Sequence, residues 1–168
     1  MTRYPTLPEK LKDQLDRIAP SDACGVTYYP CAVTLDDGSE LEGVYIVEYE
    51  PYFLLWGITP EKDPGKQSIP IDRVVAIRES SDRLPPKLAE KLYKTGESGM
   101  GYYVFTVRFS GGSRQAYVMG NAVDFITPPK GLTAAAARKV YPHVGRDASP
   151  QEGPDYYWCL YQDTDKAI

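Results

Sequence analysis

The chain has 168 residues, of which 42% are hydrophobic and 25% are charged, a balance typical of a globular domain and not of a disordered chain. Its formal net charge of −4 disfavours nonspecific binding to nucleic acid or to an anionic membrane surface. The start lacks the apolar segment of a signal peptide, and no later run approaches the length of a membrane helix, so we expect a cytoplasmic protein that does not bind membranes.

A short amphipathic helix is predicted close to the N-terminus. Thr6-Leu-Pro-Glu9 has the form of a capping box, in which the Thr side chain accepts a hydrogen bond from a first-turn amide and the Glu side chain reaches back. Apolar residues then recur at helical spacing as far as Ile18, and Pro20 ends the run. We expect this helix to cover one end of the domain.

Five short strands are predicted between Cys31 and Glu79. Residues 32–35 and 41–48 form a hairpin around Asp36-Asp-Gly-Ser39, where the glycine supplies the positive φ of a tight turn. Residues 52–58 are apolar on both faces, as in a central or barrel strand, and residues 69–71 and 74–77 complete the set. Short strands joined by tight turns favour a small closed barrel over a flat sheet.

The stretch Val33-Thr-Leu-Asp-Asp-Gly-Ser-Glu-Leu-Glu-Gly43 resembles the first signature of Sm-like small barrels, which is a strand, a DG-type turn and Leu-x-Gly. The acidic and aromatic turn 48–53, the strand 54–57 and the final pair within 69–77 follow in that family's order, and the preceding helix also fits. The resemblance covers residues 7–79 and implies an Sm-like or SH3-like barrel.

The RNA-binding residues of the Sm-like family are not matched. Where its branches carry a Lys-His or an Arg-Gly pair, this chain reads Ile71-Asp-Arg-Val-Val75, in which Arg73 is the one basic residue. The resemblance therefore implies the barrel and not the RNA site. Assembly into a ring, also typical of the family, is left open by the sequence.

A second helix is predicted after Ser80, with two prolines in its first turn and Gly96 at its end. A hairpin of residues 102–109 and 114–119 follows, whose alternating pattern buries one face and leaves the other, with Thr106 and Arg108, in solvent. A third helix, capped by Thr133, is predicted over residues 134–141, and residues 156–161 are expected to form a terminal strand.

These elements predict a mainly β, α+β fold: a small barrel with an N-terminal helix, two further helices, and an additional C-terminal hairpin and strand. The leading interpretation is one domain over residues 1–168, with the helix in 1–20, the barrel in 31–79 and the remaining elements in 80–168. Residues 107–113 echo residues 33–39, so two small barrels over 21–80 and 97–168 are the alternative.

No catalytic or metal-binding motif is recognisable. His143 is the single histidine and follows the end of a predicted helix, where a solvated or capping imidazole is the simplest interpretation. The cysteines Cys24, Cys31 and Cys159 lack CxxC spacing and are expected to be free thiols. We therefore predict no catalytic residue, no metal ligand and no cofactor.

The fourteen tyrosines supply most of the aromatic surface, and such rings suit half-buried binding faces. The leading hypothesis is a noncatalytic small-barrel interaction module that binds a protein partner, or a second copy of itself, through an acidic, Tyr-rich surface. The candidate binding residues are Tyr49, Tyr52, Trp56, Arg73, Tyr102, Arg108 and Tyr157.

Two alternatives belong to other functional classes. An Sm-like nucleic-acid binder requires Arg73, Arg78, Arg108 and Arg114 to converge on one face despite the negative total charge. A small enzyme with a Cys/His pocket requires His143 to lie within hydrogen-bond reach of a thiol or carboxylate.

Overall fold

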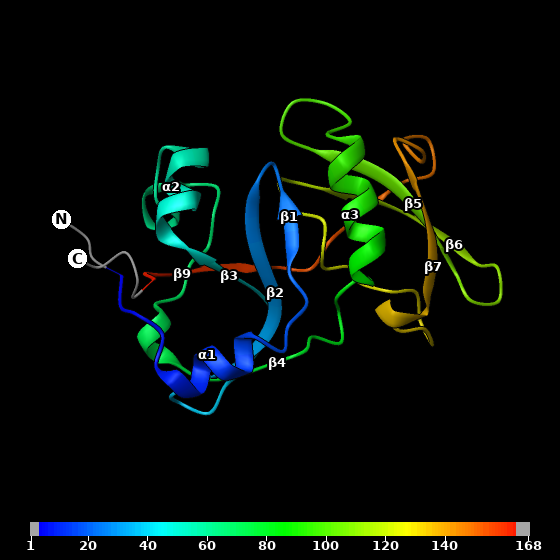
Figure 1. Cartoon of the computed structure of the whole chain (residues 1–168). Coiled ribbons are helices and arrows are strands. Elements are labelled where there is room, and N and C mark those ends of the chain that lie inside the picture. Colours follow the sequence, from blue (N-terminus) through cyan, green and yellow to red (C-terminus); the bar gives the residue numbers. More distant parts are fainter. Residues whose placement is uncertain (1–3, 164–168) are drawn as a thin grey trace. The chain divides into compact units, whose positions relative to one another are not determined.

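The computed structural model describes residues 4–163 (Figure 1). The chain divides into two compact units, one formed by residues 1–80 together with 156–168 and the other by residues 81–155. Within the described residues there are three α-helices and nine strands in two sheets. The predicted mixed α+β class, rich in strands, is confirmed at that level.

The sheet of the first unit is built on one long hairpin. Its strands are β1 (Ser21–Ala23), β2 (Val26–Leu35), β3 (Glu40–Glu48), β4 (Val74–Arg78) and β9 (Tyr157–Tyr161). They pair in the order β1-β2-β3-β9, with β4 also paired to β2, and β9 runs parallel to β3. The predicted hairpin and terminal strand are confirmed, but the described strands form an open sheet and do not close into the expected barrel.

The turn between β2 and β3 has the tight structure that its sequence predicts. Gly38 has a φ of 85° and donates its amide to the carbonyl of Leu35 at 2.9 Å. The Asp37 carboxylate accepts the amide of Ser39 at 2.9 Å. These are the local contacts that a DG-type turn requires, because only glycine adopts this φ without strain.

Helix α1 (Glu9–Leu15) covers the core of the first unit, as expected. Leu11 and Leu15 are buried there among apolar residues of the sheet. The predicted capping box is wrong, because the helix begins after Pro8 and has no side-chain cap. Thr6 lies outside the helix in an isolated bridge with Gln162, so its position is set by strand-like pairing.

The predicted strand over residues 52–58 is wrong, because this segment belongs to helix α2 (Tyr49–Trp56). A short apolar run cannot be assigned to strand or helix by periodicity alone, and tertiary context decides between them. Glu48 is still extended, whereas Gly57 has a φ of 70° and ends the helix. Between α2 and β4 the chain forms two short 3₁₀ turns, Pro60–Lys62 and Ile71–Arg73, so the second of these replaces part of the strand expected at 69–71.

The second unit contains a separate sheet and one helix. The strands are β5 (Tyr103–Phe109), β6 (Arg114–Met119), β7 (Ala137–Pro142) and β8 (Gln151–Glu152), in the order β7-β5-β6-β8, and the helix is α3 (Pro86–Thr95). The predicted hairpin and the helix that ends at Gly96 are confirmed. The predicted third helix is wrong: a 3₁₀ turn over Ala134–Ala136 leads directly into β7, because pairing with β5 overrides the helical propensity of the alanines.

The predicted wet face of β5 is wrong at Thr106, which is only 8% exposed. The segment after β7 covers this position, since the Thr106 hydroxyl donates to the carbonyl of Val144 at 2.9 Å. Arg108, farther along the same face, remains half-exposed. None of the helices within residues 4–163 combines the length and apolar content needed to span a bilayer.

Candidate functional site

Helix α2 places three of the predicted binding residues on one element of the first unit. The ring centroids of Tyr49 and Phe53 are 5.6 Å apart and those of Tyr52 and Trp56 are 6.2 Å apart, both in a tilted arrangement. Both pairs have i,i+4 spacing, which brings side chains together on a helix surface. The aromatic spacing that marked these residues in the sequence is therefore helical, and positions 49, 52, 53 and 56 follow one side of α2.

The inner side of α2 is held by a lysine that the sequence did not indicate. The Lys66 side chain is only 7% exposed, and its Nζ lies 3.5 Å from the Trp56 ring centroid. The same Nζ lies 5.1 Å from the Tyr52 ring and 5.4 Å from the Trp158 ring. A desolvated ammonium over aromatic faces is strongly attracted by their quadrupoles. Lys66 therefore attaches the segment after α2 to the helix.

Two polar contacts complete the environment of Lys66. Its Nζ donates to the Tyr52 hydroxyl at 2.9 Å and lies 3.5 Å from Oδ2 of Asp63. Burial lowers the pKa of Lys66, and the neighbouring Asp63 carboxylate opposes this shift. The inner aromatic cluster thus consists of buried or half-buried rings already occupied by a cation of the same chain.

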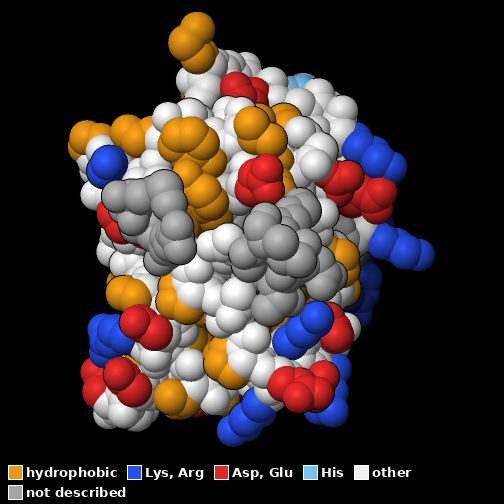
Figure 2. Space-filling model, turned by 60° about the vertical axis from the view of Figure 1, so that its left-hand side comes forward, with side chains coloured by type: hydrophobic (Ala, Val, Ile, Leu, Met, Phe, Trp, Pro, Cys, Tyr) orange, Lys and Arg blue, Asp and Glu red, His pale blue; other side chains and the backbone are white. Residues whose placement is uncertain are grey.

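The outer side of α2 carries apolar side chains that contact solvent. Phe53 and Leu55 are each 40% exposed, and Leu54 is 80% exposed. We call these three residues the α2 face. Figure 2 shows hydrophobic side chains, with acidic side chains among them, on the side of the molecule that is turned forward there. Exposed apolar side chains that form a contiguous group mark interaction surfaces more often than isolated ones do.

One edge of the α2 face is fixed by contacts between aromatic rings. The ring of Tyr4 lies 5.0 Å from that of Tyr49, which in turn makes a tilted contact with Phe53. The Tyr4 hydroxyl donates to the Glu61 carboxylate at 2.8 Å, and partial burial with this acidic partner raises the pKa of Tyr4. This short helix is thereby held at both ends, by Tyr4 at its first residue, Tyr49, and by Lys66 at its last residue, Trp56.

The electrostatic surroundings of the α2 face are acidic. Glu50 lies within α2, Glu48 precedes it, and Glu61 lies beside Tyr4. Residues 1–80 and 156–168 together contain nine Lys and Arg and sixteen Asp and Glu, a net charge of −7. Residues 81–155 contain ten Lys and Arg and seven Asp and Glu, a net charge of +3. The modest charge of the whole chain therefore conceals two units of opposite sign.

The remaining predicted residues lie on other elements of the fold. Tyr157, on β9, is half-buried against the core of the first unit. Arg73 pairs with both carboxylates of the β2–β3 turn, to Asp36 at 3.2 Å and to Asp37 at 3.3 Å. Tyr102 and Arg108 belong to the second unit. Among the predicted residues of the first unit, α2 brings together Tyr49, Tyr52 and Trp56.

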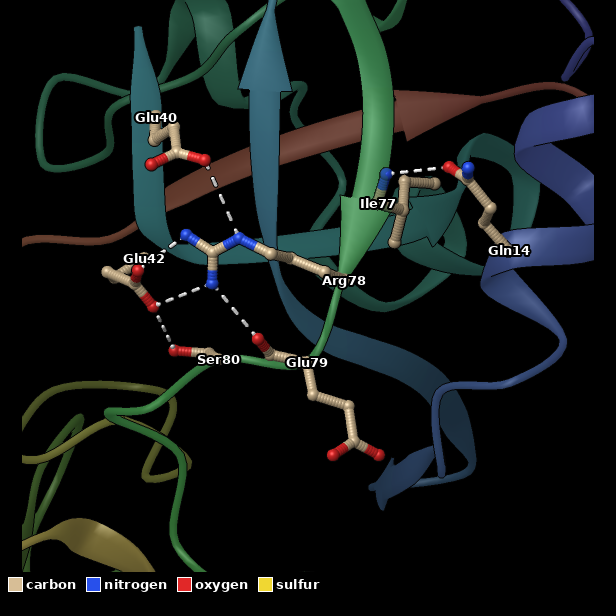
Figure 3. Close-up of polar contacts among 7 residues, drawn as sticks. All are labelled: Gln14, Glu40, Glu42, Ile77, Arg78, Glu79 and Ser80. Atoms are coloured by element: carbon tan, nitrogen blue, oxygen red, sulfur yellow. Dashed lines mark hydrogen bonds and ion pairs between the residues drawn. The ribbon is translucent and has the colours of Figure 1, made fainter.

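Arg78, at the end of β4, is also neutralised by carboxylates. Figure 3 shows its guanidinium directed at Glu42, with an Nη2–Oε1 distance of 2.6 Å, and at Glu40, 3.7 Å away. Its Nη1 also donates to the Glu79 carbonyl at 3.1 Å, and Ser80 donates to Glu42. Paired in this way, Arg78 offers little net positive charge to a phosphate.

The single histidine does not meet the condition set for the alternative of a small Cys/His enzyme. His143 Nδ1 lies 2.7 Å from the Ser98 hydroxyl, which also accepts the amide of Val104 at 2.8 Å. Among the described residues, the imidazole has neither a thiol nor a carboxylate as a hydrogen-bond partner. His143 is exposed and connects the turn around Ser98 to the segment after β7, a structural role.

The cysteines and acidic residues give no metal centre. Cys31 and Cys159 are fully buried in the core of the first unit, Cys24 is exposed, and all three are free thiols. Burial raises the pKa of Cys159, which makes this thiol a poor nucleophile. Within residues 4–163, no three His, Cys, Asp or Glu side chains are grouped so that they could hold a metal ion.

Comparison with known proteins adds no relative. No protein-family model, curated protein or solved structure matches the chain. The function is therefore inferred from the residues of this chain alone.

The sequence missed the α2 face and Lys66 for one shared reason. Assignment of 52–58 to a buried strand hides Phe53, Leu54 and Leu55, because such a strand exposes neither face. The spacing of Tyr49, Tyr52 and Trp56, at offsets of three and four, was the available signal for a helix. Nothing local to Lys66 indicated that its ammonium would be buried.

Proposed function

We propose that the protein is a noncatalytic interaction module that binds a basic, amphipathic segment of another protein through the α2 face. The observation that carries the proposal is the exposure of three consecutive apolar side chains, with Leu54 at 80%. Transfer of such side chains from water into a contact is favourable by about 1.5–3 kcal/mol for each one that is fully buried. A partner that covers them gains this free energy.

The charge around the α2 face supports a basic partner. The first unit carries a net charge of −7, with Glu48, Glu50 and Glu61 on or beside α2. Opposite charge on the partner speeds encounter and selects against acidic competitors. An amphipathic helix with a Leu-rich face and lysines at its margins has the required complementarity.

The same charge opposes pairing of two copies through this surface. Two α2 faces brought together would place two strongly acidic units side by side, and like-charge contacts are unfavourable. The sequence left open both a protein partner and self-association. Because of this repulsion, we favour the protein partner over self-association.

The proposal is tested with a labelled synthetic peptide in which leucines repeat at helical spacing and lysines fill the remaining positions. Anisotropy titrations should give saturable binding to the native protein. Leu54→Glu should weaken binding at least about tenfold, the loss expected when one buried leucine is removed from a contact. The added negative charge would by itself strengthen binding of the basic peptide. A loss of affinity in Leu54→Glu therefore shows that the apolar contact is needed.

Val75→Glu provides the matched control, because Val75 is 44% exposed in the same unit but lies on β4. It adds the same charge away from the α2 face and should leave the affinity unchanged. Equal weakening by both variants, or equal binding of a peptide with glutamates in place of the lysines, would refute the proposed site. Native-like thermal unfolding of each variant shows that the fold is retained.

The Sm-like or SH3-like character of the first unit stays a prediction. It is supported by the β2–β3 hairpin with its DG turn, by β4 paired to β2 and by the preceding helix. An Sm-like nucleic-acid site at β4 is not favoured, because Arg73 and Arg78 are paired with carboxylates.

A further inference from the structure

The sheet of the second unit carries a row of cations that, among the described residues, lack carboxylate partners of the kind that Arg73 and Arg78 have. Arg108 on β5 lies opposite Lys139 on β7 and opposite Arg114 on β6. Directly paired residues of neighbouring strands point to the same face of a sheet. The three cations therefore form one line across three strands, with neighbouring strands about 5 Å apart.

These cations have no carboxylate within ion-pair distance among the described residues, whereas Arg73 and Arg78 each have two. Arg114 and Lys139 are exposed, and Arg108 is half-exposed. The unit that carries them has a net charge of +3. Uncompensated cations on a surface attract a polyanion, and the contact releases condensed counterions.

An aromatic ring lies within the row. Tyr141 is half-exposed on β7, two residues beyond Lys139 and on the same face. The guanidinium carbon of Arg114 is 5.0 Å from its ring centroid, and Nζ of Lys139 is 5.1 Å from it. A ring flanked by two cations offers stacking for a base and charge for the phosphates on either side.

Only part of the sheet face that carries these cations is exposed to solvent. Beyond Tyr141 the chain turns over the sheet, where Gly145 closely approaches Thr106 and Ala116. A Cβ at Gly145 would lie 2.7 Å from the Ala116 side chain and 2.8 Å from the Thr106 hydroxyl, which requires glycine at this close approach. The covered half of the face ends where the row of cations begins.

We infer that the surface formed by Arg108, Arg114, Lys139 and Tyr141 binds single-stranded nucleic acid without sequence preference. The cations contact backbone phosphates, and one unstacked base lies on the Tyr141 ring. A duplex presents no exposed base face to that ring, so a single strand is the better fit. This inference concerns the second unit and is independent of the protein-binding role proposed for α2.

The test uses a short fluorescein-labelled oligothymidylate and the full chain. Three phosphate contacts predict that log Kd rises with log[salt] with a slope of about 2, because each contact with a single strand contributes about 0.7. Arg114→Gln and Lys139→Gln should each lower that slope by about 0.7 and weaken binding at low salt. Lys87→Gln, an exposed lysine in the first turn of α3, is the matched control and should change neither.

The ring is tested separately from the charges. Tyr141→Phe should retain affinity, whereas Tyr141→Leu, which keeps apolar bulk, should weaken binding at least about fivefold, the lower end of what stacking of one base contributes. Unchanged thermal unfolding of each variant shows that the sheet is intact. Further titrations use the matching duplex, inorganic polyphosphate and anionic lipid vesicles.

The inference is supported by binding that prefers the single strand and depends on both the cations and the ring. It is overturned by the absence of binding at low salt, or by equal losses with Lys87→Gln. It is also overturned if duplex or polyphosphate binds as tightly and Tyr141→Leu has no effect, since the site would then recognise charge alone. Vesicle binding that requires the same residues would assign the surface to a membrane instead.

Discussion

The ammonium nitrogen of Lys66 lies 3.5 Å from the centroid of the Trp56 ring, on the inner side of α2. This contact joins the connection between α2 and β4, residues 57–73, to Trp56, the last residue of the helix. Because α2 has only eight residues, its intrinsic stability is small and tertiary contacts must hold it. The inner contact thereby fixes the orientation in which the α2 face meets solvent.

Removal of the Lys66 ammonium should destabilise the first unit. Lys66→Ala loses the desolvated cation–π contact and the packing of the side chain, and we expect a loss of about 2–3 kcal/mol in the free energy of unfolding. Lys66→Met keeps most of the packing and should lose less. Urea denaturation followed by tryptophan fluorescence measures both, since Trp56 and Trp158 are the two tryptophans of the chain. An alanine variant as stable as the native protein would contradict this role for Lys66.

Stability should fall at alkaline pH, in part through Tyr117. Its side chain is fully buried, its hydroxyl donates to the carbonyl of Thr127 at 2.7 Å, and burial raises its pKa above the ordinary value of about 10. A group whose pKa is raised in the folded state contributes stability below the unfolded pKa and loses it as pH rises. Above pH of about 10 each such tyrosine should cost about 1.4 kcal/mol per pH unit.

Tyr117→Phe separates this effect from others at high pH. At neutral pH the variant should lose about 1 kcal/mol, the contribution of one hydrogen bond with its partner left unsatisfied. Above pH of about 10 its stability should fall less steeply than that of the native protein. Urea denaturation at a series of pH values gives both quantities, and parallel curves would show that Tyr117 ionises normally.

Helix α1 should depend on one side-chain hydrogen bond to the sheet. Gln14 Oε1 accepts the backbone amide of Ile77 on β4 at 2.8 Å (Figure 3). Gln14→Ala leaves this amide without its acceptor, and we expect a loss of about 1 kcal/mol. Lys10→Ala, at an exposed position of the same helix, should change stability by less than about 0.5 kcal/mol. Equal effects of the two variants would mean that water replaces the Gln14 contact without cost.

The elements with strong local signals were predictable from the sequence. The β2–β3 hairpin has a DG turn, α3 has prolines at its start and Gly96 at its end, and β5 alternates regularly. The failures occur where local signals are weak or absent. Residues 52–58 are apolar throughout and residues 134–137 are all alanine, so tertiary pairing decided their structure.

The candidate sites were predictable only in part, because charge pairing is a tertiary property. Arg73, Arg78, Arg108 and Arg114 are equivalent in the sequence, yet the first two face carboxylates and the last two share a row with Lys139. The opposite net charges of the two units could not be read from the sequence either, because strand β9, at the end of the chain, pairs with β3 and belongs to the acidic first unit. No local pattern reports such an arrangement.

Amide chemical-shift changes, mapped while the Leu- and Lys-containing peptide is added to isotope-labelled protein, show whether the α2 face is the protein-binding surface. We expect changes concentrated in residues 49–57 and beside them at Tyr4 and Glu61. These changes should be lost in Leu54→Glu but not in Val75→Glu. Changes centred elsewhere, or changes at α2 that persist in Leu54→Glu, would contradict it.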